Sequence, residues 1–249
     1  MTRALAAELF KLRTTRSFFW LTGSLLAIAF VVAIPVCAFP DYRVEGPQEA
    51  LLYVFGTFAQ ALSLLLGTLA VTTEFRHGTI TPTLLVVPNR LKLLGAKLTA
   101  ALLVGAALGL VVSAMIIAIV AGIGSARDFD TSGDKLGLLA GATLSSALFA
   151  LLGIGVGALV RNQIGAIVGS LLYIFVGEGV ISILFSFFDA LDDIMARYSL
   201  GAVSNALAGV NPFDADQLDQ VPAGALLTLY AAIFLVAGTL LMRRRDVTA

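Results

Sequence analysis

Few residues of this chain are of a type that does chemistry. The sequence holds one histidine, His77, and one cysteine, Cys37, so we expect no transition-metal site and no intrachain disulfide. Glu178 is the only ionisable residue deep inside an apolar segment, where a carboxyl group can act as a proton site. Gly95-Ala96-Lys97 lacks the spacing and the following hydroxyl residue of a phosphate-binding loop. An intramembrane enzyme is not expected, because no nucleophile has a base beside it.

A polar segment, Glu74–Thr83, separates two long apolar runs, Leu51–Thr73 and Leu93–Ile123. Each run is long enough to cross a hydrocarbon core that needs roughly 20 helical residues. The polar segment therefore lies at a membrane face. Arg76 and His77 fall in the last turn of the helix before it, where positive charge suits the helix dipole.

The residues after this helix predict a turn and a second, short helix. Gly78 can adopt the left-handed conformation that closes a helix. Thr81 and Pro82 suit the cap and the first position of a new helix, which must stop before Pro88. The apolar run Leu84–Val87 has little soluble mass of this chain to pack against. We favour a docking element for a soluble partner over a plain connecting loop.

The composition predicts an all-α membrane protein, since 59% of the residues are hydrophobic and 13% are charged. We expect a single transmembrane domain over residues 1–249. Because backbone exposed to lipid must satisfy its own hydrogen bonds, each span is expected to be a helix. The six expected spans are Phe18–Phe39, Leu52–Thr73, Leu93–Ile123, Leu136–Val160, Ile164–Phe188 and Ala223–Met242.

Charge predicts the orientation of these spans. Most Lys and Arg residues lie near the two termini and in the second-to-third connection, and only Arg43, Arg127, Lys135 and Arg197 fall on the opposite side. The positive-inside bias therefore predicts cytoplasmic termini. Residues 2–16 read either as an interfacial helix on the inner leaflet or as a simple topology anchor. The acidic residues of the outer loops are interpreted as solvating groups in preference to a cation site.

A pathway through the membrane has few candidate residues. Tyr53, Thr57 and Gln60 share one face of the second span, and Glu178 lies between two glycines in the fifth. Helix–helix contact explains these residues equally well. The connection 189–222 is apolar enough to lie against the membrane or to re-enter it.

The segment that begins Glu74-Phe75-Arg76-His77-Gly78-Thr79-Ile80 and continues with Leu, Pro and Arg resembles the signature of ABC type-2 permeases, the membrane subunits of bacterial ABC exporters. The basic clusters at Lys11–Arg13 and Arg243–Arg245 also fit this family. The resemblance implies that residues 74–90 form a cytoplasmic coupling loop whose short helix fits a groove on a separate ATPase. It assigns docking and coupling to Glu74, Phe75, Arg76, His77, Gly78, Thr79, Thr81, Leu84 and Leu85. Pro82 departs from the family pattern and leaves the start of the coupling helix open.

The resemblance further implies a transport subunit without enzymatic activity, paired with a second permease copy or a homologous permease and with two ATPase subunits. No cofactor is expected on this chain, since ATP and Mg²⁺ belong to the ATPase. Membrane lipid is an expected partner and nucleic acid is not. The expected location is the bacterial plasma membrane. An ion-coupled secondary carrier that uses Glu178 is the alternative, although such a carrier should show paired acids or an inverted repeat.

Overall fold

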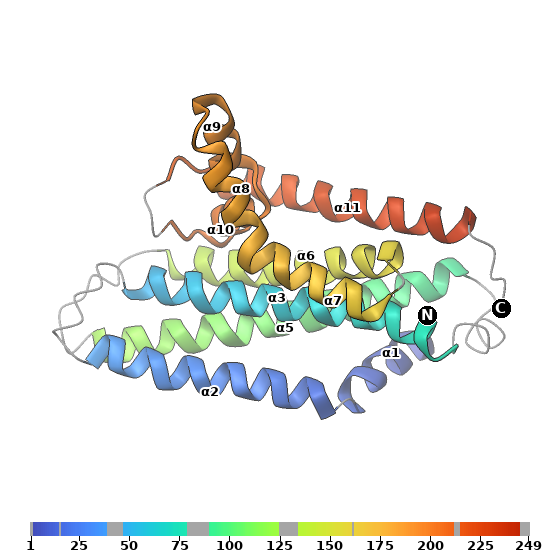
Figure 1. Cartoon of the computed structure of the whole chain (residues 1–249). Coiled ribbons are helices and arrows are strands. Elements are labelled where there is room, and N and C mark those ends of the chain that lie inside the picture. Colours follow the sequence, from blue (N-terminus) through green and yellow to red (C-terminus); the bar gives the residue numbers. More distant parts are fainter. Residues whose placement is uncertain are drawn as a thin grey trace.

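The computed structural model describes residues 2–14, 16–38, 47–78, 90–124, 134–160, 162–211 and 215–244. Within these ranges the chain is a succession of helices, and the start of α1 lies at the same end of the bundle as the end of α11 (Figure 1). The elements are α1 (Thr2–Thr14), α2 (Arg16–Ala38), α3 (Pro47–Arg76), α5 (Arg90–Gly124), α6 (Lys135–Val160), α7 (Gln163–Leu172), the π-helical η1 (Tyr173–Gly177), α8 (Glu178–Phe185), α9 (Asp189–Tyr198), α10 (Leu200–Ala208) and α11 (Gln220–Arg244).

Among the residues that the structure describes, six segments are long and apolar enough to cross a membrane, which confirms the expected number of spans. They are Phe19–Ala38, Gln48–Arg76, Lys92–Ile123, Lys135–Val160, Gln163–Phe185 and Gln220–Leu241. The second span begins before the expected Leu52, and the sixth begins before the expected Ala223. These early starts arise because each helix continues into polar residues that a hydropathy window leaves out.

The helix α6 forms the centre of the bundle and packs against α3, α5 and α11. Its contact with α3 depends on small residues. A Cβ atom on Gly67 would collide with the backbone carbonyl of Ala150, and one on Gly153 would collide with that of Leu64. Glycine therefore lets the two helix backbones approach closely, as is usual between helices in a membrane.

The fifth span differs from the single helix expected over Ile164–Phe188. It starts at a capped end, where the side chain of Asn162 accepts hydrogen bonds from the backbone N–H groups of Ile164 and Gly165 at 3.0 and 3.2 Å. The π-helical turn η1 then separates α7 from α8. Such turns re-aim the residues that follow them, and α8 leads away from the bundle to α9 (Figure 1).

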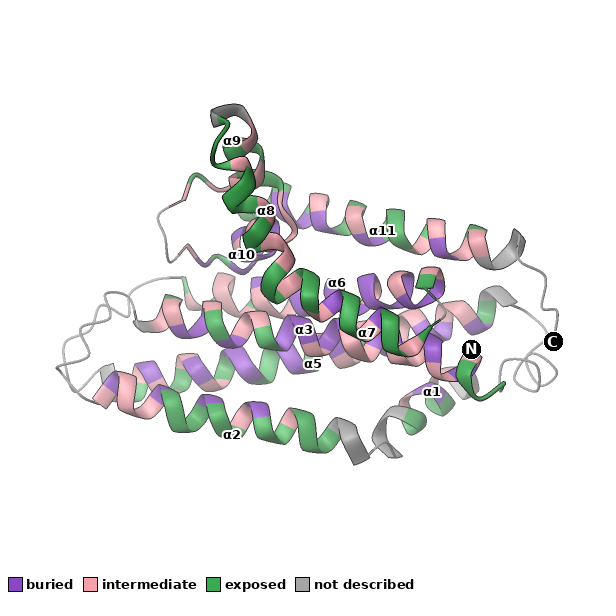
Figure 2. Cartoon of the chain, viewed as in Figure 1, coloured by how far each residue is buried: buried purple, intermediate pink, exposed green. Residues whose placement is uncertain are grey.

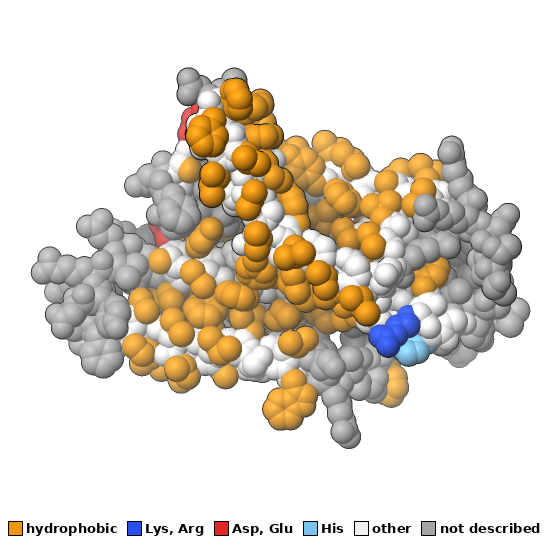
Figure 3. Space-filling model, viewed as in Figure 1, with side chains coloured by type: hydrophobic (Ala, Val, Ile, Leu, Met, Phe, Trp, Pro, Cys, Tyr) orange, Lys and Arg blue, Asp and Glu red, His pale blue; other side chains and the backbone are white. Residues whose placement is uncertain are grey.

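The outer connection expected over residues 189–222 is largely helical. The helix α10 packs against α6 and α11, and α11 already begins at Gln220. Of the six spans, the fifth is the least buried within this chain. Many residues along α7 and α8 are exposed (Figure 2), and hydrophobic side chains cover this face of the molecule (Figure 3).

Candidate functional site

A buried ionic cluster joins three helices at the end of the bundle where α3 stops and α5 starts. Its centre is Lys97 of α5, whose Nζ atom donates to Glu74 Oε1 at 2.6 Å, to Glu8 Oε2 at 3.0 Å and to the Ala70 carbonyl at 3.1 Å. An ammonium group has three protons to donate. The three acceptors therefore satisfy the Lys97 side chain, which is only 7% exposed.

Lys11 of α1 completes this ionic cluster. Its Nζ atom lies 2.8 Å from Glu8 Oε1 and 3.0 Å from Glu74 Oε1, so two lysines face two glutamates and the formal charges balance. Burial lowers the pKa of Lys11, but hydrogen bonds and attraction from Glu8 and Glu74 outweigh burial and raise the pKa above 10.5. Lys11 thus stays protonated at neutral pH.

The ionic cluster fixes three elements relative to one another. Glu8 belongs to α1, Glu74 lies in the last turn of α3, and Lys97 lies near the start of α5. Removing one member of a buried ion pair is costly because it leaves an uncompensated charge. A displacement of the segment between α3 and α5 would therefore act on α1 as well.

The C-terminal end of α3 has the turn that the sequence predicts. The His77 N–H donates to the Thr73 carbonyl at 3.0 Å, and the Gly78 N–H donates to the Phe75 carbonyl at 3.4 Å. Gly78 has a φ of +62°, the left-handed conformation that favours glycine. Directly before this turn, Arg76 donates to the Gln163 side chain at 3.1 Å and so links α3 to α7.

The residues expected to dock an ATPase divide into three groups. Arg76, His77 and Gly78 are exposed, whereas Phe75 is half-buried and packs against the core. Glu74 is buried within the ionic cluster, so its carboxylate is not part of the exposed surface. The remaining expected residues, Thr79, Thr81, Leu84 and Leu85, lie outside the described residues, as does the expected coupling helix.

Sequence reasoning missed the other members of the ionic cluster. The sequence motifs give no structural role to Lys97 or to Glu8. One signal was available for each residue. Glu8 is the only acid before the first span, and Lys97 interrupts the apolar run Leu93–Ile123. A charge inside an apolar run is usually paired.

Tyr53, Thr57 and Gln60, three of the expected pathway residues, lie in the half of α3 away from the ionic cluster. Gln60 donates to the Ser145 hydroxyl at 3.0 Å and accepts from the Ser204 hydroxyl at 3.2 Å, which joins α3, α6 and α10. Thr57 bonds to the carbonyl of Tyr53 on its own helix. These contacts match the helix–helix interpretation, and a role in a pathway stays a prediction.

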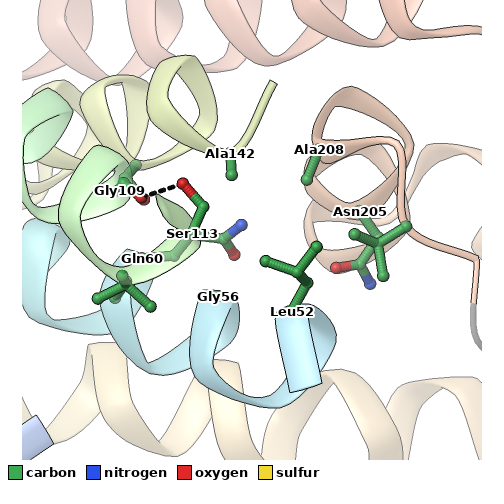
Figure 4. Close-up of a pocket in the computed structure, with 12 residues that line it drawn as sticks. Leu52, Gly56, Gln60, Gly109, Ser113, Ala142, Asn205 and Ala208 are labelled. Atoms are coloured by element: carbon green, nitrogen blue, oxygen red, sulfur yellow. Dashed lines mark hydrogen bonds between the residues drawn. The ribbon is translucent and has the colours of Figure 1, made fainter. Parts of the chain in front are cut away.

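A small cavity adjoins Gln60 and is shown in Figure 4, with Ser113 beside Gln60 and Asn205 of α10 across the space. Its volume is about 10 Å³. A single water molecule needs roughly this much room. In this conformation the cavity is therefore too small for a solute.

Glu178 occupies the first position of α8, directly after η1, and is half-buried. Its Oε1 atom accepts a hydrogen bond from the backbone N–H of Gly201 at 2.6 Å. Gly201 lies in the first turn of α10, where backbone N–H groups have no partner within the helix. Glu178 thus caps α10 from the fifth span.

These features define a multi-pass helical membrane protein with a buried ionic cluster at one end. The sequence profile described as "ABC-2 family transporter protein" matches residues 4–177, and the chain belongs to this ABC-2 transporter family. The match covers α1, the first four spans and part of the fifth, and thus all members of the ionic cluster. The family consists of transport membrane subunits that associate with ABC ATPases. The comparison with curated proteins gave no match.

Proposed function

We propose that this chain is the permease subunit of an ATP-driven exporter. Two permease copies form the translocation pathway, and two separate ATPase subunits bind them. The termini and the segment between α3 and α5 face the cytoplasm. The exposed helix end at Arg76, His77 and Gly78 then points toward the ATPase, and residues 79–89 supply the docking helix.

The ionic cluster carries this proposal. A coupling segment must pass a movement of the ATPase to the spans on both sides of it. Glu74 and Lys97 lie at the ends of these two spans and are 2.6 Å apart. Glu8 brings α1 into the same contact. The cluster therefore allows one displacement to move three helices together.

In this proposal α1 is the interfacial helix on the inner leaflet. Phe10 is 67% exposed and Trp20, just beyond the start of α2, is 78% exposed. Aromatic side chains favour the boundary between lipid and water. Glu8 points the other way, into the ionic cluster. The helix α1 thus contacts lipid on one side and the bundle on the other.

Membership in the ABC-2 transporter family does not favour the alternative function of an ion-coupled carrier. The Glu178 carboxylate is also engaged with a backbone N–H group. A secondary carrier would transport its solute without an ATPase, and the ATPase test below separates the two functions.

The test replaces Leu84 or Leu85 by Asp, which places a charge in the proposed docking helix. Each variant should insert normally but lose the co-purifying ATPase or its substrate-stimulated ATP hydrolysis. The matched control is Leu136→Asp, because Leu136 is 75% exposed at the opposite end of the bundle. Retention of ATPase and stimulation in both variants would show that this segment is not the docking surface. Purification from native membranes as a monomer without ATPase would contradict the assembly.

A further inference from the structure

A groove lies on the side of the bundle, between α7 and η1 on one wall and α11 on the other, with α6 beneath. Its volume is about 550 Å³, within the range of small-molecule sites. The helices α9 and α10 border its outer end, where the Tyr230 hydroxyl donates to the Tyr198 carbonyl at 2.8 Å. We call this space the lateral groove.

The lining of the lateral groove is apolar and aromatic. Leu152, Val156 and Phe234 contribute hydrocarbon and aromatic surface, and Tyr173 and Tyr230 add two further rings. No Asp, Glu, Lys or Arg is among the described residues that line it. A charged ligand would lose its hydration here without gaining a partner. The occupant is therefore uncharged.

Among the described residues that line the lateral groove, one buried side-chain polar atom has no hydrogen-bond partner. The Ser170 hydroxyl is buried, the residue is only 9% exposed, and no group of the described residues bonds to this hydroxyl. Ser63 is the other buried side chain in this state, but it does not line the groove. A buried hydroxyl without a hydrogen bond is costly. Ser170 therefore favours an occupant that carries a hydrogen-bonding group.

Many other helical hydroxyls of this protein bond to a carbonyl of their own helix. A helical Ser or Thr usually bonds back to the carbonyl four residues earlier. Hydroxyls with this bond are those of Thr57, Thr68, Thr72, Thr99, Ser113, Thr143, Thr228 and Thr239. The Ser170 hydroxyl does not make this bond among the described residues. The hydrogen-bonding capacity of this hydroxyl is thus unused by the described residues, and Ser170 is among the residues that line the lateral groove.

Gly169, beside Ser170, provides space in the same wall. A Cβ atom on Gly169 would meet nothing within 4 Å. By contrast, Gly153 and Gly157, which have the same spacing as Gly165 and Gly169, pack tightly against α3. Gly169 therefore makes no close helix contact within the described part of this chain. Here the glycine leaves the groove open.

We propose that the lateral groove binds an uncharged, largely apolar small molecule that enters from the bilayer and forms a hydrogen bond with Ser170. The walls belong to membrane spans whose outer faces are apolar and exposed, so access from lipid is direct. The site lies within one chain and requires no ATPase. It holds whether or not the proposed transport function is correct.

The test uses a long-chain alcohol with a diazirine in its chain, added to the purified full-length protein in lipid vesicles. Light should attach this probe to peptides of α7, η1 and α11. Unlabelled hexadecanol should compete about threefold to tenfold better than hexadecane, since one hydrogen bond distinguishes them. In Ser170→Ala this preference should disappear while hexadecane competes as before.

Gly169→Leu adds a side chain to the groove wall at a position where a Cβ atom meets nothing within 4 Å, and it should reduce labelling about tenfold or more. Gly179→Leu is the matched control, because it makes the same change in the same span at a site where a Cβ atom also meets nothing within 4 Å, outside the groove. It should label normally. Equal labelling of all lipid-facing helices, or labelling unchanged by Gly169→Leu, overturns the proposal.

The alternative occupant of the groove is a second copy of the chain, and a cysteine variant distinguishes this case. Cys37, the one natural cysteine, is 1% exposed, so in Gly169→Cys the new thiol is the accessible one. Modification by a lipid-soluble maleimide, slowed by hexadecanol, supports a ligand site. Oxidation to a disulfide between two copies shows an interface and overturns the proposal.

Discussion

The Nζ atom of Lys97 and the Oε1 atom of Glu74 lie 2.6 Å apart. This contact joins the last turn of α3 to α5. Both side chains are at most 10% exposed. Glu8 reaches the same ammonium group from α1. These contacts hold α1, α3 and α5 together at this end of the bundle.

Lys97→Met should destabilise the protein by about 3–5 kcal/mol, because it leaves two buried carboxylates with Lys11 alone. Thermal unfolding in detergent measures this effect. The control is Lys92→Met on the same helix, where the side chain is exposed and its loss should cost less than that of Lys97. In a double-mutant cycle, Glu8→Gln and Lys97→Met should show a coupling of about 0.5–3 kcal/mol. Additive effects would show that the contact between α1 and α5 contributes no measurable free energy to stability.

The contribution of Lys11 should depend on pH only in the alkaline range. Its pKa is raised above 10.5 in the folded protein, so the folded state holds the proton more tightly than the unfolded state. The stabilisation is therefore complete below about pH 10.5 and is lost as the pH rises through the folded pKa. The difference in melting temperature between wild type and Lys11→Met should stay constant from neutral pH to about pH 9. A difference that falls within this interval contradicts the raised pKa.

Gly78→Val should weaken the turn after α3, whereas Gly78→Asn should be nearly silent. The φ of +62° costs a β-branched residue about 1–2 kcal/mol, and asparagine tolerates it. Crowding is not the cause, since a Cβ atom at this position meets nothing within 4 Å. Trypsin cleavage after Arg76 reports the opening of the turn. Equal cleavage rates in the two variants would contradict the role of the backbone conformation.

Glu178→Ala should release the start of α10, and Glu178→Gln should largely retain it, because the amide oxygen can still accept from Gly201. The expected loss for alanine is about 1.5–3 kcal/mol, the range for a hydrogen bond to a charged group. The measurement pairs thermal unfolding with maleimide modification of an Ala202→Cys variant in the first turn of α10, which should accelerate when alanine replaces Glu178. A transport defect in Glu178→Gln at unchanged stability would instead favour a pathway role.

Local properties of the sequence determined the class of this protein. Long apolar runs must form helices in lipid, so composition and run length were sufficient for the six spans. The left-handed turn at Gly78 was also predictable, since glycine tolerates positive φ where other residues do not. The motif after the second span indicated the family because its residues are adjacent in the chain and can be recognised without the fold.

Only the tertiary structure decided which distant side chains meet. Glu8 and Lys97 are 89 positions apart, and Gln60 and Ser204 are 144 positions apart. Hydropathy and periodicity are measured along one helix, and they do not define how that helix is rotated and shifted against its neighbours. The same limit applies to Ser170, a small polar residue of the kind that commonly serves helix contact. It became a candidate ligand contact only when the packing of α6, α7 and α11 left a space beside it.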